Sequence, residues 1–130
     1  MINSSRIMNP QAITGIFGSM PNFKDTELLN VQLKRDGPTL FIQLSTKEIV
    51  KNKPKRWSEW DIVYIEMSFF DVKNLEVNSF GTINEIEQFD IKEIGEEGSV
   101  KIKCSNSTSI NCLFDWARIE QISPGLLGTP

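Results

Sequence analysis

The spacing of apolar residues changes after the first twenty positions of the chain. Before that point they recur every three or four positions, a period typical of a helix with one buried face: Ile13, Ile16, Phe17 and Met20. Asn9 is suited to the N-cap, and Pro10 fits the first helical position. Gly18 and Pro21 favour an end to the helix. We therefore expect one short N-terminal helix.

From residue 29 the apolar period becomes two, which predicts half-buried strands. Asp36-Gly37 favours a turn, so folding the chain there predicts a hairpin. Pro38 has no N–H to close a tight turn, and we expect a loop slightly longer than two residues. The expected apolar pairs are Leu33 with Leu40, Val31 with Ile42, and Leu29 with Leu44.

A polar, basic connection over residues 45–60 precedes the next strand. That strand has an apolar face of Val63, Ile65, Met67 and Phe69, and a second face of Ile62, Tyr64, Glu66 and Ser68. Folding the chain about Val72 predicts a second hairpin. Its expected pairs are Phe69 with Leu75 and Met67 with Val77.

The apolar residues of segment 83–94 fit neither a helix nor a strand cleanly. Its Glu, Gln and Lys residues favour a helix, but we favour a strand with a bulge. Folding the chain about Thr108 then predicts a last hairpin, followed by a strand over residues 118–122. The expected pairs are Cys104 with Cys112, Ile102 with Phe114, and Val100 with Trp116.

These elements predict a mainly β protein with a minor helical part. We expect about eight mostly antiparallel strands, arranged as a curved sheet, a sandwich or an open barrel, and one short N-terminal helix. A length of 130 residues is typical of one domain, so we expect residues 1–130 to form a single domain. The sequence carries no signal for an oligomeric state.

The amino-acid composition excludes several classes of catalytic and metal-binding site. The chain contains no histidine, which excludes serine–histidine and cysteine–histidine catalysis and histidine-ligated metals. Two cysteines are too few for a disulfide framework or a four-thiolate zinc site. A net charge of −3 makes a nucleic-acid partner unexpected. We expect no cofactor, no membrane partner and a cytoplasmic location.

Two groups of side chains are candidates for binding a protein partner. The first combines aromatic and acidic residues, since aromatic rings supply much contact area: Trp57, Glu59, Asp61, Phe70 and Asp71. We expect Trp60 to be the more buried of the two neighbouring tryptophans. Phe70 is either packed under the helix, which we favour, or exposed for a partner. The second group belongs to an acid-rich stretch, residues 84–98, that could steer a basic partner: Glu93, Glu96 and Glu97.

A succession of short motifs resembles the bacterial immunity protein 50 family from about Ile13 to Pro124. In order, the motifs are Gly37-Pro38-Thr39-Leu40, Pro54-Lys55-Arg56-Trp57 with Trp60 and Val63, Phe69-Phe70-Asp71-Val72-Lys73-Asn74-Leu75, and Phe80-Gly81. Phe80 departs from the family, where many members have Trp. The resemblance implies a protein encoded beside a toxin, which it binds and blocks without chemistry of its own.

Two other functions are compatible with the same residues. The strands could close into a barrel that carries a small ligand in an apolar cavity. Two acids such as Glu66 and Asp90 could also converge in a cleft and support a carboxylate-based hydrolase.

Overall fold

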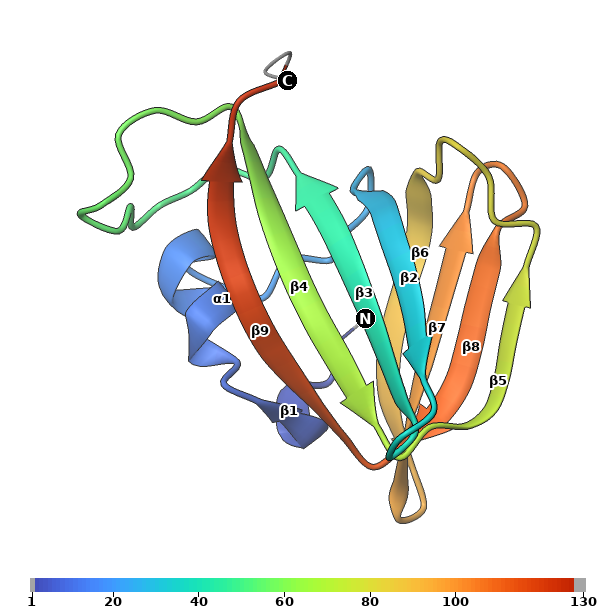
Figure 1. Cartoon of the computed structure of the whole chain (residues 1–130). Coiled ribbons are helices and arrows are strands. Elements are labelled where there is room, and N and C mark those ends of the chain that lie inside the picture. The colour runs from blue at the N-terminus through green and yellow to red at the C-terminus, as the bar shows by residue number, and fades with distance from the viewer. Residues whose placement is uncertain (1, 128–130) are drawn as a thin grey trace.

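The computed structural model describes residues 2–127 and confirms a mainly β protein with nine strands in this part of the chain (Figure 1). One sheet has the order β1-β9-β4-β3-β2, and the other has the order β5-β8-β7-β6. The five-stranded sheet comprises β1 (Ile7–Met8), β2 (Glu27–Lys34), β3 (Thr39–Thr46), β4 (Ile62–Phe70) and β9 (Trp116–Gly125). The four-stranded sheet comprises β5 (Lys73–Asn78), β6 (Ile86–Ile94), β7 (Glu97–Cys104) and β8 (Ser109–Phe114). Every pairing between neighbouring strands is antiparallel except the one between β1 and β9.

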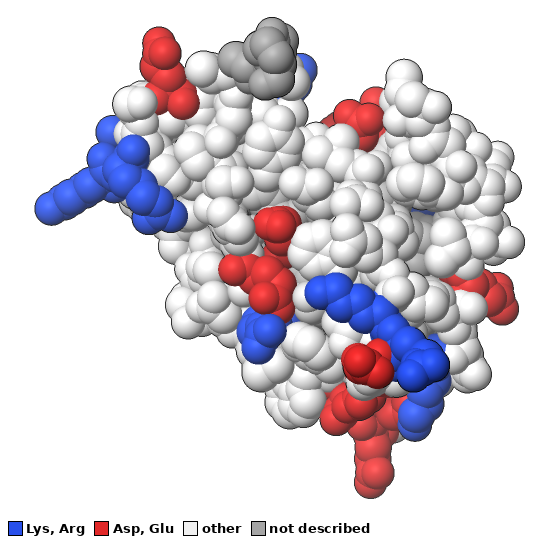
Figure 2. All heavy atoms as spheres, viewed as in Figure 1, with Lys and Arg blue, Asp and Glu red and all other residues white. Residues whose placement is uncertain are grey.

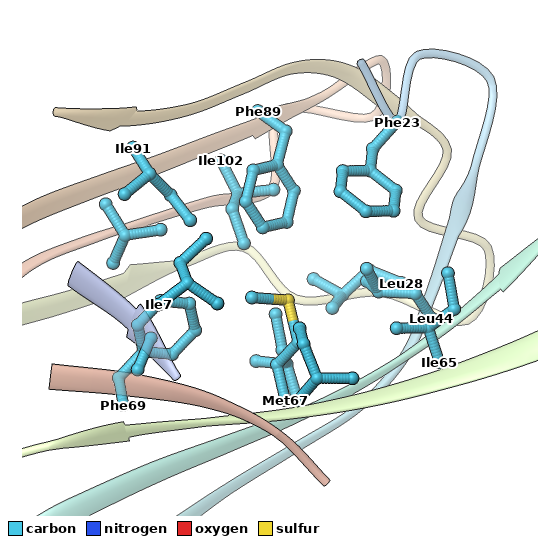
Figure 3. Packing of buried hydrophobic residues seen from close by; sticks show 14 of the residues in the cluster. Ile7, Phe23, Leu28, Leu44, Ile65, Met67, Phe69, Phe89, Ile91 and Ile102 are labelled. Carbon is cyan, nitrogen blue, oxygen red and sulfur yellow. The ribbon is translucent and has the colours of Figure 1, made fainter. Parts of the chain in front are cut away.

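The two sheets enclose one hydrophobic core, as expected from strands with alternating apolar residues. Phe69 of β4 meets Phe114 of β8 with ring centroids 5.0 Å apart, and Phe23 meets Phe89 of β6 at 5.1 Å. Side chains of both sheets fill the space between them (Figure 3). The described strands therefore form a two-layer arrangement, and they do not close into a barrel.

The expected helix is α1 (Gln11–Phe17), which buries Ile13 and Phe17 and lies behind β9 in Figure 1. Gly18 ends it in a left-handed conformation with φ 84°, as its lack of a Cβ allows. The prediction that Asn9 is the N-cap is wrong. Pro10 occupies that position, and the Asn9 backbone is left-handed, with its side chain accepting a hydrogen bond from Gln11.

The first hairpin forms with a four-residue loop, and Leu33 and Val31 pair as expected. The third expected pair is wrong because a bulge between Leu28 and Asn30 shifts the register. Leu28 pairs with Leu44 and is buried, while Leu29 is 38% exposed.

The second hairpin, expected about Val72, does not form. Strand β4 pairs with β3 and β9, and the chain then crosses to the other sheet, where β5 pairs with β8. Asp71 adopts a φ of 57° and its N–H donates to the Gly37 carbonyl, while the Val72 N–H donates to the Pro38 carbonyl. These bonds tie the crossing to the first hairpin loop.

The ambiguous segment contains strand β6, with a bulge between Ile86 and Gln88, as we favoured. The hairpin that follows forms β7 and β8, but its expected register is wrong. The Cys104 N–H bonds the Thr108 carbonyl, so the turn is centred two residues earlier than expected. The apolar pairs are therefore Ile102 with Ile110 and Val100 with Cys112, and Gly98 lies opposite Phe114. Both cysteines are buried free thiols, but they are not cross-strand partners.

Candidate protein-binding face

Aromatic and charged side chains lie together on the outward side of the five-stranded sheet. In Figure 1 no helix or strand crosses in front of β9, β4 and β3, because α1 and the second sheet lie behind them. We call this surface the open face. Its outward side chains are Phe41 and Gln43 of β3, Tyr64, Glu66, Ser68 and Phe70 of β4, and Trp116, Arg118 and Glu120 of β9.

The open face follows directly from strand alternation. Along β4 the side chains of Ile65, Met67 and Phe69 enter the core, so those of Glu66 and Ser68 must point outward. Strands β3 and β9 lie on either side of β4, and their alternate residues join the same surface.

Four aromatic residues lie on the open face without being fully buried. Phe41, Tyr64 and Phe70 are half-buried, and Trp116 is 43% exposed. Aromatic side chains in such positions are typical anchors in protein interfaces, since docking a partner removes the remaining ring surface from water. Figure 2 shows this face, with acidic and basic atoms near its middle, a further group of both at its lower right, and uncharged surface above them.

A shallow hollow of about 390 Å³ lies in this face, lined among others by Phe41, Glu66, Phe70, Arg118 and Glu120. The Arg118 Nε donates a hydrogen bond to the Glu120 carboxylate at 2.7 Å. The guanidinium also lies over the Phe70 ring, 5.0 Å from its centroid. The Arg118 guanidinium thus makes a cation–π contact with the Phe70 ring and a charge-assisted hydrogen bond with the Glu120 carboxylate.

The sequence-predicted binding residues do not form one surface. Phe70 is half-buried on the open face beneath Arg118, so the favoured alternative, packing under the helix, is wrong. Asp71 is exposed just beyond it. Glu59 and Asp61 are exposed before the opposite end of β4, a nine-residue strand that spans roughly 30 Å. The Asp61 carboxylate there accepts a hydrogen bond from the Leu127 N–H at 2.8 Å.

Trp57 belongs to the core. It is 2% exposed, whereas Trp60 is only half-buried, so our expectation that Trp60 is the more buried ring is wrong. The two rings pack edge to face, with centroids 5.5 Å apart. The loop 47–61 folds back so that Trp57 enters the core, a placement that periodicity within a strand does not predict. A ring buried in this way offers no surface to a partner.

The acids at the β6–β7 turn are engaged within the protein. Arg6 donates from Nη2 to the Glu96 carbonyl at 2.6 Å, and its Nε lies 3.8 Å from the Glu93 carboxylate. The Arg6 Nη1 also contacts Asp115, through its carbonyl at 3.0 Å and its carboxylate at 3.4 Å. Glu97 lies 3.6 Å from Lys73. These contacts tie the N-terminal segment and β5 to the turn and reduce its net negative charge.

Lysines of the neighbouring strand β7 lie opposite residues of the acid-rich strand β6. Asp90 lies opposite Lys101, and Gln88 lies opposite Lys103, so the acids do not form a continuous patch. Asp90 projects from the outer side of the four-stranded sheet, because its neighbours Phe89 and Ile91 are buried. Glu66 projects from the outer side of the other sheet, so this pair of acids does not converge in a cleft.

Burial keeps the two thiols protonated. It raises the pKa of Cys112 to about 12. Burial also raises the pKa of Cys104, with a smaller contribution from the Glu87 carboxylate. Among the described residues, no group of three or more Cys, Asp or Glu side chains could hold a metal ion.

A second hollow, of about 380 Å³, lies between α1 and β9 and is lined in part by Ala12, Ile16 and Arg56. This hollow is a surface depression, and side chains of both sheets pack in the core between them. No helix within residues 2–127 has the length and apolar character needed to cross a membrane.

Sequence reasoning missed the centre of the open face, although part of the signal was present. The alternation in β4 places Tyr64, Glu66 and Ser68 together on its second face, as expected. The neighbours that complete the surface, Phe41 and Arg118, come from strands whose pairing with β4 the sequence did not predict.

Comparison with known proteins identifies one family. No curated protein and no solved structure matches the chain. A model of the immunity protein 50 family matches residues 9–125, nearly the whole chain and the same region in which the short motifs occur. The chain therefore belongs to the immunity protein 50 family.

Proposed function

We propose that this protein binds a cognate bacterial toxin in the cytoplasm of the producing cell and blocks it, with no catalysis of its own. The observation that carries this proposal is the match of the family model to residues 9–125, because the family suggests an immunity function. We infer from the resemblance that the toxin is encoded beside this chain.

The arrangement of side chains supports binding as the mode of action. Two sheets packed on a filled core make a rigid scaffold, and a rigid surface loses little entropy when a partner docks. The open face presents partly exposed aromatic and charged groups on three neighbouring strands. The chain has no histidine, so the commonest general base at neutral pH is missing.

Co-expression with the neighbouring toxin tests the proposal. Cells that produce the toxin together with this protein should survive, and cells that produce the toxin with an empty vector should not. An inactivated toxin should elute with the purified protein as a complex on a sizing column. Death of the co-expressing cells, together with separate elution of the two proteins, would refute the proposed function.

A further inference from the structure

The hollow in the open face contains two similar pairs of side chains, of which one already holds a cation. Phe70 and Glu120 form the first pair, and the Arg118 guanidinium lies between them. Arg118 lies opposite Ser68 in the β4–β9 register, diagonal to Phe70. The sheet therefore brings ring and cation together through diagonal cross-strand neighbours, which are about 7–8 Å apart at their backbones and within reach of long side chains.

Phe41 and Glu66 form the second pair on the other side of Ser68. Phe41 lies opposite Ser68 in the β3–β4 register, and Glu66 lies two residues before Ser68. Phe41 and Glu66 are therefore also diagonal neighbours, although this diagonal runs in the opposite direction along β4. Both residues are half-buried and line the same hollow. Within residues 2–127, no ion pair or side-chain hydrogen bond reaches the Glu66 carboxylate.

The protein's own lysine in the hollow belongs to the opposite end of it. Lys34 of β2 lies opposite Thr39, which lies opposite Phe70. Along β4, Glu66 lies four residues from Phe70, which corresponds to roughly 13 Å at the rise of a strand. Among the described residues, Lys34 makes no ion pair with Glu66, and the Arg118 guanidinium pairs with Glu120.

We propose that the toxin inserts a lysine or arginine side chain between the Phe41 ring and the Glu66 carboxylate, so that the open face is the toxin-binding face. This inference rests on the proposed function and adds the surface and the chemistry of recognition. A half-buried carboxylate loses its remaining water when a partner docks, and a cation that replaces this water supplies a charge-assisted hydrogen bond. The ring adds a cation–π contact. The net charge of −3 favours encounter with a basic partner.

Charge substitutions on the two sheets provide a matched test. Glu66→Gln removes the charge and preserves the shape of the side chain, and Glu66→Lys reverses the charge. Glu76→Gln and Glu76→Lys make the same changes on β5 of the other sheet, where Glu76 is exposed and lies opposite Asn111. The affinity of each purified variant for an inactivated form of the neighbouring toxin is measured by titration calorimetry. Urea denaturation of each variant shows whether it is folded.

We expect Glu66→Gln to raise Kd about tenfold and Glu66→Lys about a hundredfold, since each tenfold step corresponds to about 1.4 kcal/mol and charge pairs at interfaces reach this range. The Glu76 variants should bind like the wild type.

Wild-type affinity of the folded Glu66 variants would overturn the inference while leaving the proposed function intact. Equal weakening by Glu66→Lys and Glu76→Lys would also overturn it, by showing that only net charge matters. If Glu66→Lys changes the oligomeric state on a sizing column but not toxin affinity, the occupant is a second copy and the inference fails. Failure of the wild-type protein to bind would refute the proposed function itself.

Discussion

The two neighbouring tryptophans show how burial separates residues that look alike in the sequence. Trp57 is 2% exposed and lies in the core, while Trp60 packs against its ring from a half-buried position. The Trp57 Nε1 is buried with no hydrogen-bond partner among the described residues, which offsets part of the gain from burying the ring. We therefore assign Trp57 to the scaffold.

Replacement of Trp57 by Ala should lower the free energy of unfolding by about 3–5 kcal/mol, the range found when a large buried aromatic side chain is truncated. Trp60→Ala is the matched control and should cost less, because its ring keeps more contact with water. Urea denaturation followed by circular dichroism measures both effects. A Trp57→Ala protein of wild-type stability that no longer binds toxin would instead make Trp57 a contact residue.

The buried thiol of Cys112 should make the stability of the protein depend on pH. Burial raises the pKa of Cys112 to about 12 from its usual value of 9.0, so the thiol stays protonated in the folded state where it would ionise in the unfolded chain. The unfolded state then binds fewer protons between these two pH values, and stability should fall as pH rises through this window.

Cys112→Ala should remove this contribution to the pH dependence, and the difference between the wild-type and variant unfolding free energies from pH 8 to 11 measures it. The change can reach at most about 1.4 kcal/mol per pH unit for one group. Alkylation by iodoacetamide should likewise require unfolding. Rapid alkylation of Cys112 in the native protein at pH 8.5 would show that its thiol is accessible and ionised.

At the scale of elements, close contacts fix the register that the sequence did not reveal. Gly98 of β7 lies opposite Phe114 of β8, and a Cβ at Gly98 would lie only 2.5 Å from the Phe114 ring. Phe114 is fully buried against Phe69, so the ring has little room to move. A glycine at this position lets the ring pass over the neighbouring strand.

Gly98→Ala should therefore destabilise the protein by about 1–3 kcal/mol, as overpacking of a core usually does. Gly15→Ala is a control of opposite sign. Outside the backbone of helix α1 itself, no described atom lies within 4 Å of a Cβ at Gly15, and the substitution should stabilise the protein by about 0.5–1 kcal/mol. Thermal or urea unfolding compares the two variants. A neutral Gly98→Ala substitution would contradict the β7–β8 register.

Alternation along the chain predicted where most strands lie and which of their side chains face the core, because that signal is local. It did not predict their partners. Leu75 and Val77 would fit a hairpin with β4 as well as they fit the edge of the other sheet. The backbone hydrogen bonds that join Asp71 and Val72 to the first hairpin loop, where the chain crosses between the sheets, leave no trace in the periodicity of apolar residues. The turn of the last hairpin was likewise placed two residues too late. The expected pairs and the observed pairs are both apolar, so the alternation of apolar residues did not distinguish the two registers.

At the scale of the whole molecule, the binding residues predicted from the sequence lie apart from one another, and which of them contact a toxin stays a prediction. Glu59 and Asp61 lie before one end of β4, and Asp71 lies after the other. The acids of the β6–β7 turn contact Arg6 and Lys73, which come from distant parts of the chain. The open face combines strands β3, β4 and β9, and only their pairing makes it a surface.

The most direct measurement of the central claim is a map of the bound toxin on this protein. Amide NMR spectra of the labelled protein are compared with and without an inactivated form of the neighbouring toxin. We predict that the largest changes fall on outward residues of β3, β4 and β9 around Phe41 and Glu66. Changes concentrated at the Glu93 to Glu97 turn, with the open face unaffected, would contradict this account.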